Sequence, residues 1–431
     1  MTKRKVEEVV DDDELVPIAE LKKKRNKRKK DEENDRSYLD PGSVGTSYYY
    51  EGYLRKVYPY YYQYRTWCKG RWMGRKLMEV LSTEFRNLPP EPLEYKIKTG
   101  SILVNNNPVG VDYVLKGHDF MTHRAHRHEL PILASDIEIV HEDENMLVVN
   151  KPPSIPTHCC GRYRFNTMIA ILYTEHGYKD LQTCHRLDRL TSGILMFGKN
   201  VDATCKIHKE IGDRTVKKEY LCRVIGNFPD EEVTVDQPLD VLCRKIGAAF
   251  ISSTGKESQT TFKKISFNGK SSLVHCFPKT GRTHQIRVHL QYLGFPIVND
   301  PLYDSFAFGP EKGKNGNYGM DQEQLMASVR KEHMADNWFE QRPHQDVDSD
   351  SKAKHNVNTK TYLGKGFAER EPKFDPSKMT KDPVCEECDH RYKEQEANHM
   401  MMFLHSLKYS GSDWSYETKP PFWAEDGYDL V

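Results

Sequence analysis

The segment His185-Arg186-Leu187-Asp188-Arg189-Leu190-Thr191-Ser192-Gly193 leads directly into the apolar run Ile194-Leu195-Met196-Phe197-Gly198. A short apolar run that ends on glycine is typical of a buried strand, so the polar residues before it form a turn entering the core. Such a turn holds the carboxylate of Asp188 rigidly and partly away from water, where the Thr, Ser and Gly that follow can donate hydrogen bonds. Asp188 is therefore the first candidate for a reactive group.

Other apolar runs predict the rest of a sheet. Strands are expected at 146–151, 194–198, 218–226 and 272–277. Beyond the last of these, Ile286, Leu290 and Leu293 recur at helical spacing and predict an amphipathic helix that begins near Thr280 or Arg282. Strands and helices do not alternate regularly, so we expect an α+β domain with a mixed, largely antiparallel sheet.

Two further segments place polar groups beside apolar sequence. Lys218-Glu219-Tyr220 opens one expected strand, and the segment Lys279–Leu290 carries Arg287 into the expected helix. Taken alone, an Asp188–Arg287 pair is more often a structural ion pair, and Tyr220 is more often a core aromatic. Only the joint pattern favours a catalytic site.

Four runs together resemble the RluA family of RNA pseudouridine synthases, in motif and in order. They are HRLDRLTSG (185–193), KKEY (217–220), KTGRTHQIRVHL (279–290) and GFPIVNDPLY (294–303). The resemblance covers residues 137–303, and residues 383–409 complete it. The N-terminal stretch, with LRKV (54–57) and HRHE (126–129), is similar to the eukaryotic branch that includes tRNA position-32 synthases. The resemblance implies the fold of these synthases and isomerisation of a uridine to pseudouridine, with position 32 of tRNA as the expected target.

The resemblance also assigns roles to residues. Asp188 is the carboxylate that acts on a uridine flipped out of its RNA, whether by attack at C1′, by attack at C6 or through a glycal. Arg287 keeps that carboxylate ionised by its opposite charge. Tyr220 stacks on the flipped uracil and is a candidate acceptor of the C5 proton. Arg186 fills the space that the base leaves, and Arg282 and His284 are candidate RNA contacts, with a structural role as the alternative for His284. No metal and no nucleotide cofactor are implied.

The N-terminal part differs in composition from the rest. Nine tyrosines crowd residues 48–64, interleaved with Arg55 and Lys56. Aromatic and cationic side chains in this pattern either stack bases and hold phosphates or pack against a neighbouring domain. Helical spacing over 73–85, a turn and strand at 97–105, and KGHD (116–119) resemble the S4 RNA-binding module. We expect a small S4-like α/β RNA-binding module within residues 46–130.

Two short motifs contain residue types that can bind a metal ion. His123, His126 and His128 alternate, but no cysteine or acidic cluster accompanies them at zinc spacing, so a cationic strand edge facing RNA is the favoured interpretation. Cys385 and Cys388 form a CxxC pair, and the nearest histidines, at 390 and 399, complete no convincing ligand set. A structural or residual pair is the favoured interpretation, with a metal site and a redox pair as the alternatives.

Charge is distributed unevenly, although the net charge of the 431 residues is only +1. Residues 1–40 are neutral, residues 41–300 carry about +8 and residues 301–431 about −7, so a basic body that can attract a polyanion is hidden by the total. We expect a disordered charged tail at 1–45, a catalytic domain at 131–305, an insertion or linker at 306–380 and a C-terminal segment at 381–431 that completes the catalytic domain.

Compartment and function class follow from composition and from the resemblance. Ten cysteines without dense, even spacing indicate reduced thiols, and the sequence contains neither an apolar run of about 20 residues nor an apolar start. The basic run at 22–30 is typical of nuclear import, so we expect the nucleus, the cytoplasm or both, with the mitochondrion left open. We expect a monomeric enzyme acting on tRNA; the rival hypothesis is a catalytically silent RNA-binding or scaffold protein. The presence of Asp188, Tyr220 and Arg287 favours the enzyme.

Overall fold

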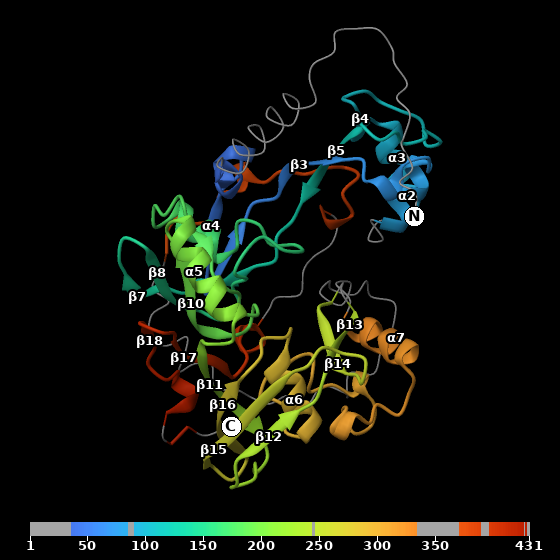
Figure 1. Cartoon of the computed structure of the whole chain (residues 1–431). Helices are drawn as coiled ribbons and strands as arrows, with labels where there is room; N and C mark the ends of the chain where they lie inside the picture. The colour runs from blue at the N-terminus through green and yellow to red at the C-terminus, as the bar shows by residue number, and fades with distance from the viewer. Residues whose placement is uncertain are drawn as a thin grey trace, which may run out of the picture.

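The computed structural model describes residues 36–84, 90–243, 246–333, 370–388, 396–425 and 427–428. These residues form a large sheet with helices packed against it and a smaller N-terminal part beside it (Figure 1). In the described part of the chain, no helix combines the length and the apolar character that crossing a membrane requires.

A ten-stranded sheet organises the molecule. Its strand order is β12-β15-β16-β11-β17-β10-β8-β7, with β9 paired to β10 and β18 paired to β17. The pairing of β10 with β17 is parallel and the other pairings are antiparallel, which confirms the predicted α+β class with a mixed, largely antiparallel sheet. The strands are β7 (Glu138–Glu142), β8 (Met146–Lys151), β9 (Gln182–Thr183), β10 (Ser192–Gly198), β11 (Lys217–Ile225), β12 (Val233–Asp236), β15 (Gln259–Phe267), β16 (Ser271–Pro278), β17 (Leu404–Ser410) and β18 (Ser415–Glu417).

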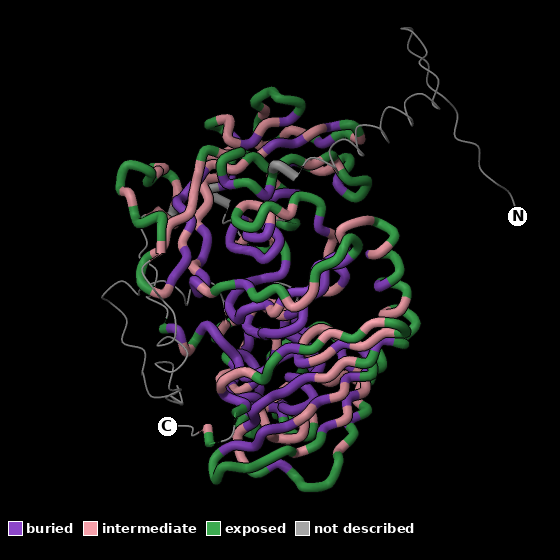
Figure 2. The backbone as a smooth tube through the Cα atoms, turned by 90° about the vertical axis from the view of Figure 1, so that its left-hand side faces the viewer, coloured by how far each residue is buried: buried purple, intermediate pink, exposed green. Residues whose placement is uncertain are grey.

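The centre of this sheet is the core of the molecule. Every residue of β10 is buried, which explains why its sequence is continuously apolar rather than alternating. Figure 2 shows the buried backbone gathered in the middle of the molecule. Helix α5 (Val201–Gly212) packs on β10, and α6 (Gln285–Leu293) packs on β15 and β16. The helix expected from 280 or 282 therefore begins a few residues later.

The C-terminal segment supplies a central strand. β17 pairs with both β10 and β11, although it follows them by about two hundred residues. Gly193 makes this parallel pairing possible: it has a φ of +108°, and a Cβ there would lie 2.1 Å from the carbonyl oxygen of Ser406. The two halves of the sheet are thus joined through a strand that arrives late in the sequence.

The N-terminal part contains two small sheets and two helices. One sheet has the order β1-β2-β6 and the other β3-β5-β4. A separate apolar cluster, which includes Trp72, Leu77 and Met121, lies beneath the second sheet. The elements are β1 (Tyr48–Glu51), β2 (Leu54–Val57), β3 (Tyr60–Trp67), α2 (Leu77–Glu84), α3 (Pro90–Lys98), β4 (Ile102–Val104), β5 (Phe120–Arg127) and β6 (Ile132–Leu133). The S4-like identification stays a prediction.

The structure refines or corrects three local expectations. The turn and strand expected over 97–105 begin later, because α3 continues through Lys98 and the strand β4 covers only Ile102–Val104. The tyrosines divide between roles: Tyr58 and Tyr60 are buried packing residues, whereas Tyr64 is exposed. The predicted disorder at 1–45 is wrong for 36–45, where two short 3-10 helices form and Leu39 is 1% exposed against α4 (Met168–Thr174). The rest of that tail lies outside the described residues.

The first part of the segment predicted as an insertion or linker, 306–380, is folded and is therefore not a linker. Residues 306–333 fold onto the hairpin β13–β14 and end in the helix α7 (Gln322–His333). Phe308, Leu325 and Val329 form an apolar cluster there with residues of both strands. This packing could not be seen in the polar composition of the segment, because its few apolar residues are widely spaced. The strands are β13 (Leu239–Cys243) and β14 (Ala248–Ile251). Residues 334–369 lie outside the described part.

Candidate active site

Buried hydrogen bonds hold the turn that carries Asp188. The Thr191 N–H donates to the Asp188 carbonyl, and the hydroxyl of Thr157 bonds to the backbone of Leu187. Lys151 at the end of β8 is fully buried, and its Nζ donates to the carbonyls of Pro152, Ile155 and Arg189 at 2.9–3.1 Å. Burial lowers the pKa of this lysine to about 7. The turn is therefore held by buried hydrogen bonds at both of its ends.

A guanidinium joins two carboxylates at this turn. Arg287 of α6 donates from Nη1 to Oδ2 of Asp188 at 3.2 Å. Its Nε and Nη2 make a two-pronged pair with Asp300 at 2.7 and 2.8 Å. The Asp300 side chain is 0% exposed, that of Arg287 6% and that of Asp188 25%. The buried ion pair with Asp300 fixes the orientation of the guanidinium, so that its Nη1 group faces the more exposed carboxylate of Asp188.

The electrostatics of the turn favour an ionised Asp188. Burial raises the pKa of this carboxyl, but His284, which is charged only at acid pH, and the permanent charge and hydrogen bond of Arg287 lower it below its ordinary value. His284 is itself neutral at pH 7, because burial and the Arg287 charge lower its pKa to about 4. Arg287 is thus the cation that keeps Asp188 charged at neutral pH.

His284 is the residue before α6 and adopts the left-handed conformation, with a φ of +57°. Its Nε2 lies 3.5 Å from Oδ2 of Asp188, and its Nδ1 lies 2.9 Å from the hydroxyl of Tyr303. A non-glycine residue in this conformation costs about 1–3 kcal/mol, so the surrounding contacts must hold it in place. The position brings a neutral imidazole beside the carboxylate.

Tyr220 lies on β11 with its ring 9% exposed. Its hydroxyl is 2.5 Å from the hydroxyl of Tyr409 on β17, and the Tyr409 ring stacks on His185 at 4.8 Å between centroids. Burial and the charge of Asp188 raise the pKa of Tyr220, so the phenol stays protonated at neutral pH. The Asp188 turn, β11 and the C-terminal strand therefore meet at this point of the sheet.

Comparison with known proteins places this geometry in a family. The family model described as RNA pseudouridylate synthase matches residues 145–292, which include Asp188, Tyr220 and Arg287. The pseudouridylate synthase RPUSD2 of Mus musculus is 42% identical over 418 residues, which are 91% of this chain and 75% of the mouse protein. The chain belongs to the RluA family of RNA pseudouridine synthases.

Two yeast relatives of this synthase have named positions. The mitochondrial tRNA pseudouridine(32) synthase of Saccharomyces cerevisiae is 34% identical over 389 residues, covering 87% of this chain and 78% of the yeast protein. The tRNA pseudouridine(31) synthase of the same yeast is 35% identical over 299 residues, covering 60% of this chain and 74% of that protein.

The three predicted RNA contacts of the synthase occupy different settings. Arg186 is exposed next to the turn, and its charge acts on Asp188. His284 lies against Asp188, as described above. Arg282 is half-buried, and its Nε donates to the carbonyl of Glu257 at 3.0 Å, so its guanidinium is engaged with the protein.

Three partners of the site were missed by sequence reasoning. Asp300 and Tyr303 fall in the run GFPIVNDPLY, which was recognised as a motif but given no side-chain roles. The Asp-Pro pair at 300–301, which follows the expected helix within this motif, was the available signal for Asp300. Tyr409 had no signal, because only the late pairing of β17 with β11 brings it to Tyr220.

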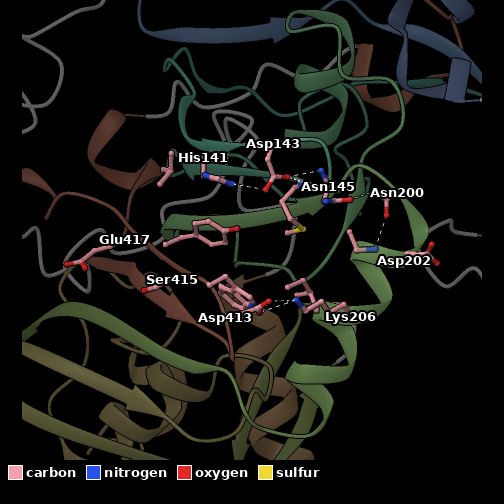
Figure 3. Close-up of a pocket in the computed structure, with 15 residues that line it drawn as sticks. His141, Asp143, Asn145, Asn200, Asp202, Lys206, Asp413, Ser415 and Glu417 are labelled. Carbon is pink, nitrogen blue, oxygen red and sulfur yellow. Dashed lines mark hydrogen bonds and ion pairs between the residues drawn. The ribbon is translucent and has the colours of Figure 1, made fainter.

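A cavity of the synthase lies away from the Asp188 site. It has a volume of about 970 Å³ and is bordered by β7, the start of α5 and the β17–β18 hairpin. Figure 3 shows its polar rim, where Lys206 pairs with Asp413 and His141 with Asp143. None of the predicted catalytic residues lines it. Its wall mixes apolar side chains, such as Val140, Met146 and Ile207, with polar ones, and no residue of the four motifs lines it, so it does not compete with the Asp188 site as a catalytic centre.

Proposed function

We propose that this synthase isomerises uridine 32 of tRNA, with Asp188 as the reacting carboxylate. The observation that carries the catalytic part is a carboxylate held ionised by Arg287 at the end of a rigid turn, with Tyr220 nearby. The position is supported by the yeast position-32 synthase, whose similarity extends over most of the chain, whereas that of the position-31 synthase covers a shorter part.

The reaction requires the uridine to leave its stack in the RNA. That costs a few kcal/mol, which contacts made only to the flipped nucleotide must offset. Arg186 is exposed beside the turn and long enough to fill the space that the base vacates. The flipped uracil then stacks on the face of Tyr220.

Asp188 reacts with the flipped nucleotide, the N1–C1′ bond breaks, the uracil turns, and C5 joins C1′. Arg287 keeps the carboxylate charged without itself reacting, because its two other nitrogens are occupied by Asp300. As C5 joins C1′, any bond between Asp188 and the nucleotide breaks and the carboxylate is released, while C5 loses a proton and N1 gains one. Tyr220 is protonated and hydrogen-bonded to Tyr409, so it can take the C5 proton only by passing on its own, and this hydroxyl pair is the proposed relay that returns a proton to N1. Neutral His284 orients the carboxylate from its other side.

A mapping experiment tests the position. Purified synthase is incubated with tRNA transcripts that carry uridine at both 31 and 32, and pseudouridine is located by chemical modification and primer extension. The proposal expects product at 32, and none when position 32 is changed to cytidine while 31 is kept. Product at 31 alone, or only in ribosomal RNA, would contradict the assignment.

The rival function, a silent RNA-binding or scaffold protein, gives a different result in the same experiment. It would bind the transcripts and leave every uridine unmodified.

The expected monomer is checked by the sedimentation of the active protein. The expected nuclear or cytoplasmic location rests on residues 22–30, which lie outside the described residues; a reporter fused to the full chain with and without this run tests it, and mitochondrial accumulation of both forms would overturn it.

A further inference from the structure

Two motifs that are far apart in the sequence meet in the structure. His126 lies near the end of β5 and His128 just beyond it, while Cys385 and Cys388 flank the short 3-10 helix η9 (Glu386–Cys388). One ligand atom from each of these four residues lies within 4.8 Å of all the others. In Figure 1 the orange-red chain that carries the cysteines runs beside β5.

We propose that His126, His128, Cys385 and Cys388 bind one zinc ion that fastens the C-terminal segment to the N-terminal part of the chain. Two thiolates and two imidazoles are the ligand set of tetrahedral structural zinc sites. With four protein ligands no coordination position stays open, so the ion is structural and does not take part in the uridine chemistry.

The distances suit a tetrahedral ion. Zinc–sulfur bonds of about 2.3 Å and zinc–nitrogen bonds of about 2.0–2.1 Å separate neighbouring ligand atoms by about 3.3–3.8 Å. Sγ of Cys388 lies 3.3 Å from Nδ1 of His126 and 3.4 Å from Nε2 of His128. The two ring nitrogens are 3.2 Å apart. These three atoms need shifts of only a few tenths of an ångström to reach zinc geometry, and the widest separation in the cluster, up to 4.8 Å, must close by about 1 Å.

Hydrogen bonds around the cluster prepare it for a cation. The Thr380 hydroxyl donates to the Pro59 carbonyl, so its oxygen accepts from Nε2 of His126 at 2.8 Å. This contact assigns the proton of His126 to Nε2 and leaves the lone pair of Nδ1 directed at the cluster. The N–H of Asp382 donates to Sγ of Cys388 at 3.4 Å, which supports a thiolate there.

The four-residue cluster is also linked to a loop beside the Asp188 turn. Glu387, between the two cysteines, pairs with Arg162 at 2.6 Å, and Arg127, between the two histidines, donates to the Gly161 carbonyl at 2.9 Å. The loop at 160–162 is thus held from both sides of the cluster. The guanidinium of Arg189, the residue after Asp188, lies 5.8 Å from the ring of Tyr163, the residue after this loop. Loss of the ion would loosen a loop that adjoins the Asp188 turn.

Elemental analysis of the full-length protein purified without chelator tests the site. The expected result is one zinc per chain, and loss of that zinc in Cys388→Ser and in His126→Gln. Cys205→Ser is the matched control, since Cys205 is an exposed free cysteine on α5, and it should keep the full complement.

A second measurement covers variants that fail to fold. Cobalt(II) added to chelator-treated wild-type protein should give the intense visible bands of tetrahedral cobalt and a near-ultraviolet thiolate-to-cobalt band, and zinc should displace both. Less than a tenth of an equivalent of zinc in the purified protein, together with no tetrahedral cobalt spectrum, would overturn the proposal. A disulfide between Cys385 and Cys388 in protein kept under reducing conditions would overturn it as well.

Discussion

Replacing Arg287 with methionine separates the structural from the catalytic role of this residue. Asp300 is fully buried and receives two of the guanidinium's hydrogen bonds, so the substitution leaves an uncompensated buried carboxylate. Breaking a buried ion pair in this way costs about 3–5 kcal/mol. Urea denaturation should therefore show a loss of that size in the free energy of unfolding of Arg287→Met.

The double variant Arg287→Met/Asp300→Asn removes the stranded charge. Asparagine keeps an acceptor oxygen for the N–H groups of Leu302 and Tyr303, so most of the lost stability should return, to within about 1–2 kcal/mol of wild type. Activity should stay well below the wild-type level, because Asp188 has lost its cation, while enough activity remains to record a pH profile.

The pH profile of the double variant shows in which direction Arg287 shifts the pKa of Asp188. In the wild type the pKa of Asp188 lies below its ordinary value, so activity is retained until the pH falls through that low pKa. Without Arg287 the burial of Asp188 raises its pKa above the wild-type value, so the acid limb of activity moves to higher pH. Tritium release from RNA labelled at uridine C5 gives the profile. A double variant with wild-type turnover and an unmoved acid limb would refute the reasoning, as would a single variant of wild-type stability.

Three further substitutions test other contacts. Tyr220→Phe keeps the ring but removes the hydroxyl bonded to Tyr409; it should bind tRNA normally and lose most tritium release, whereas equal release in both proteins would leave the hydroxyl without a chemical role. Gly193→Ala places a Cβ 2.1 Å from the Ser406 carbonyl and demands a φ of +108°, so a loss of more than about 1 kcal/mol is expected in denaturant titrations, and a neutral effect would contradict the described β10–β17 pairing. Between pH 7 and 9 Lys151 binds fewer protons in the folded than in the unfolded protein, because burial lowers its pKa to about 7. The free energy of unfolding of the wild type should therefore rise by about 2 kcal/mol over that range, and that of Lys151→Met should not. A wild type without this rise would show that Lys151 is hydrated in the folded protein.

The local parts of the site could be predicted from the sequence. Asp188 stands directly before an apolar strand, and Arg287 falls within a helical repeat, so local sequence marked both residues, whereas their pairing across 99 residues was implied only by the family resemblance. The sheet class followed from the same apolar runs. These features depend on neighbours within about ten residues, which a single sequence displays.

Long-range packing produced everything that was missed. Tyr409 reaches Tyr220 only because β17 inserts between β10 and β11, and no local pattern specifies that pairing. The order of residues 36–45 depends on Leu39 packing against α4, and the fold of 306–333 depends on the β13–β14 hairpin. The cysteine and histidine motifs each lacked half of a ligand set until the fold brought them together.

The central claim is that Asp188 reacts with uridine in RNA, and one measurement tests it directly. Wild type and Asp188→Asn are compared for tritium release from the same C5-labelled tRNA, with RNA binding and unfolding measured on both proteins. The account predicts that the variant folds and binds tRNA but releases no tritium above background. Turnover by Asp188→Asn at the wild-type rate would contradict it.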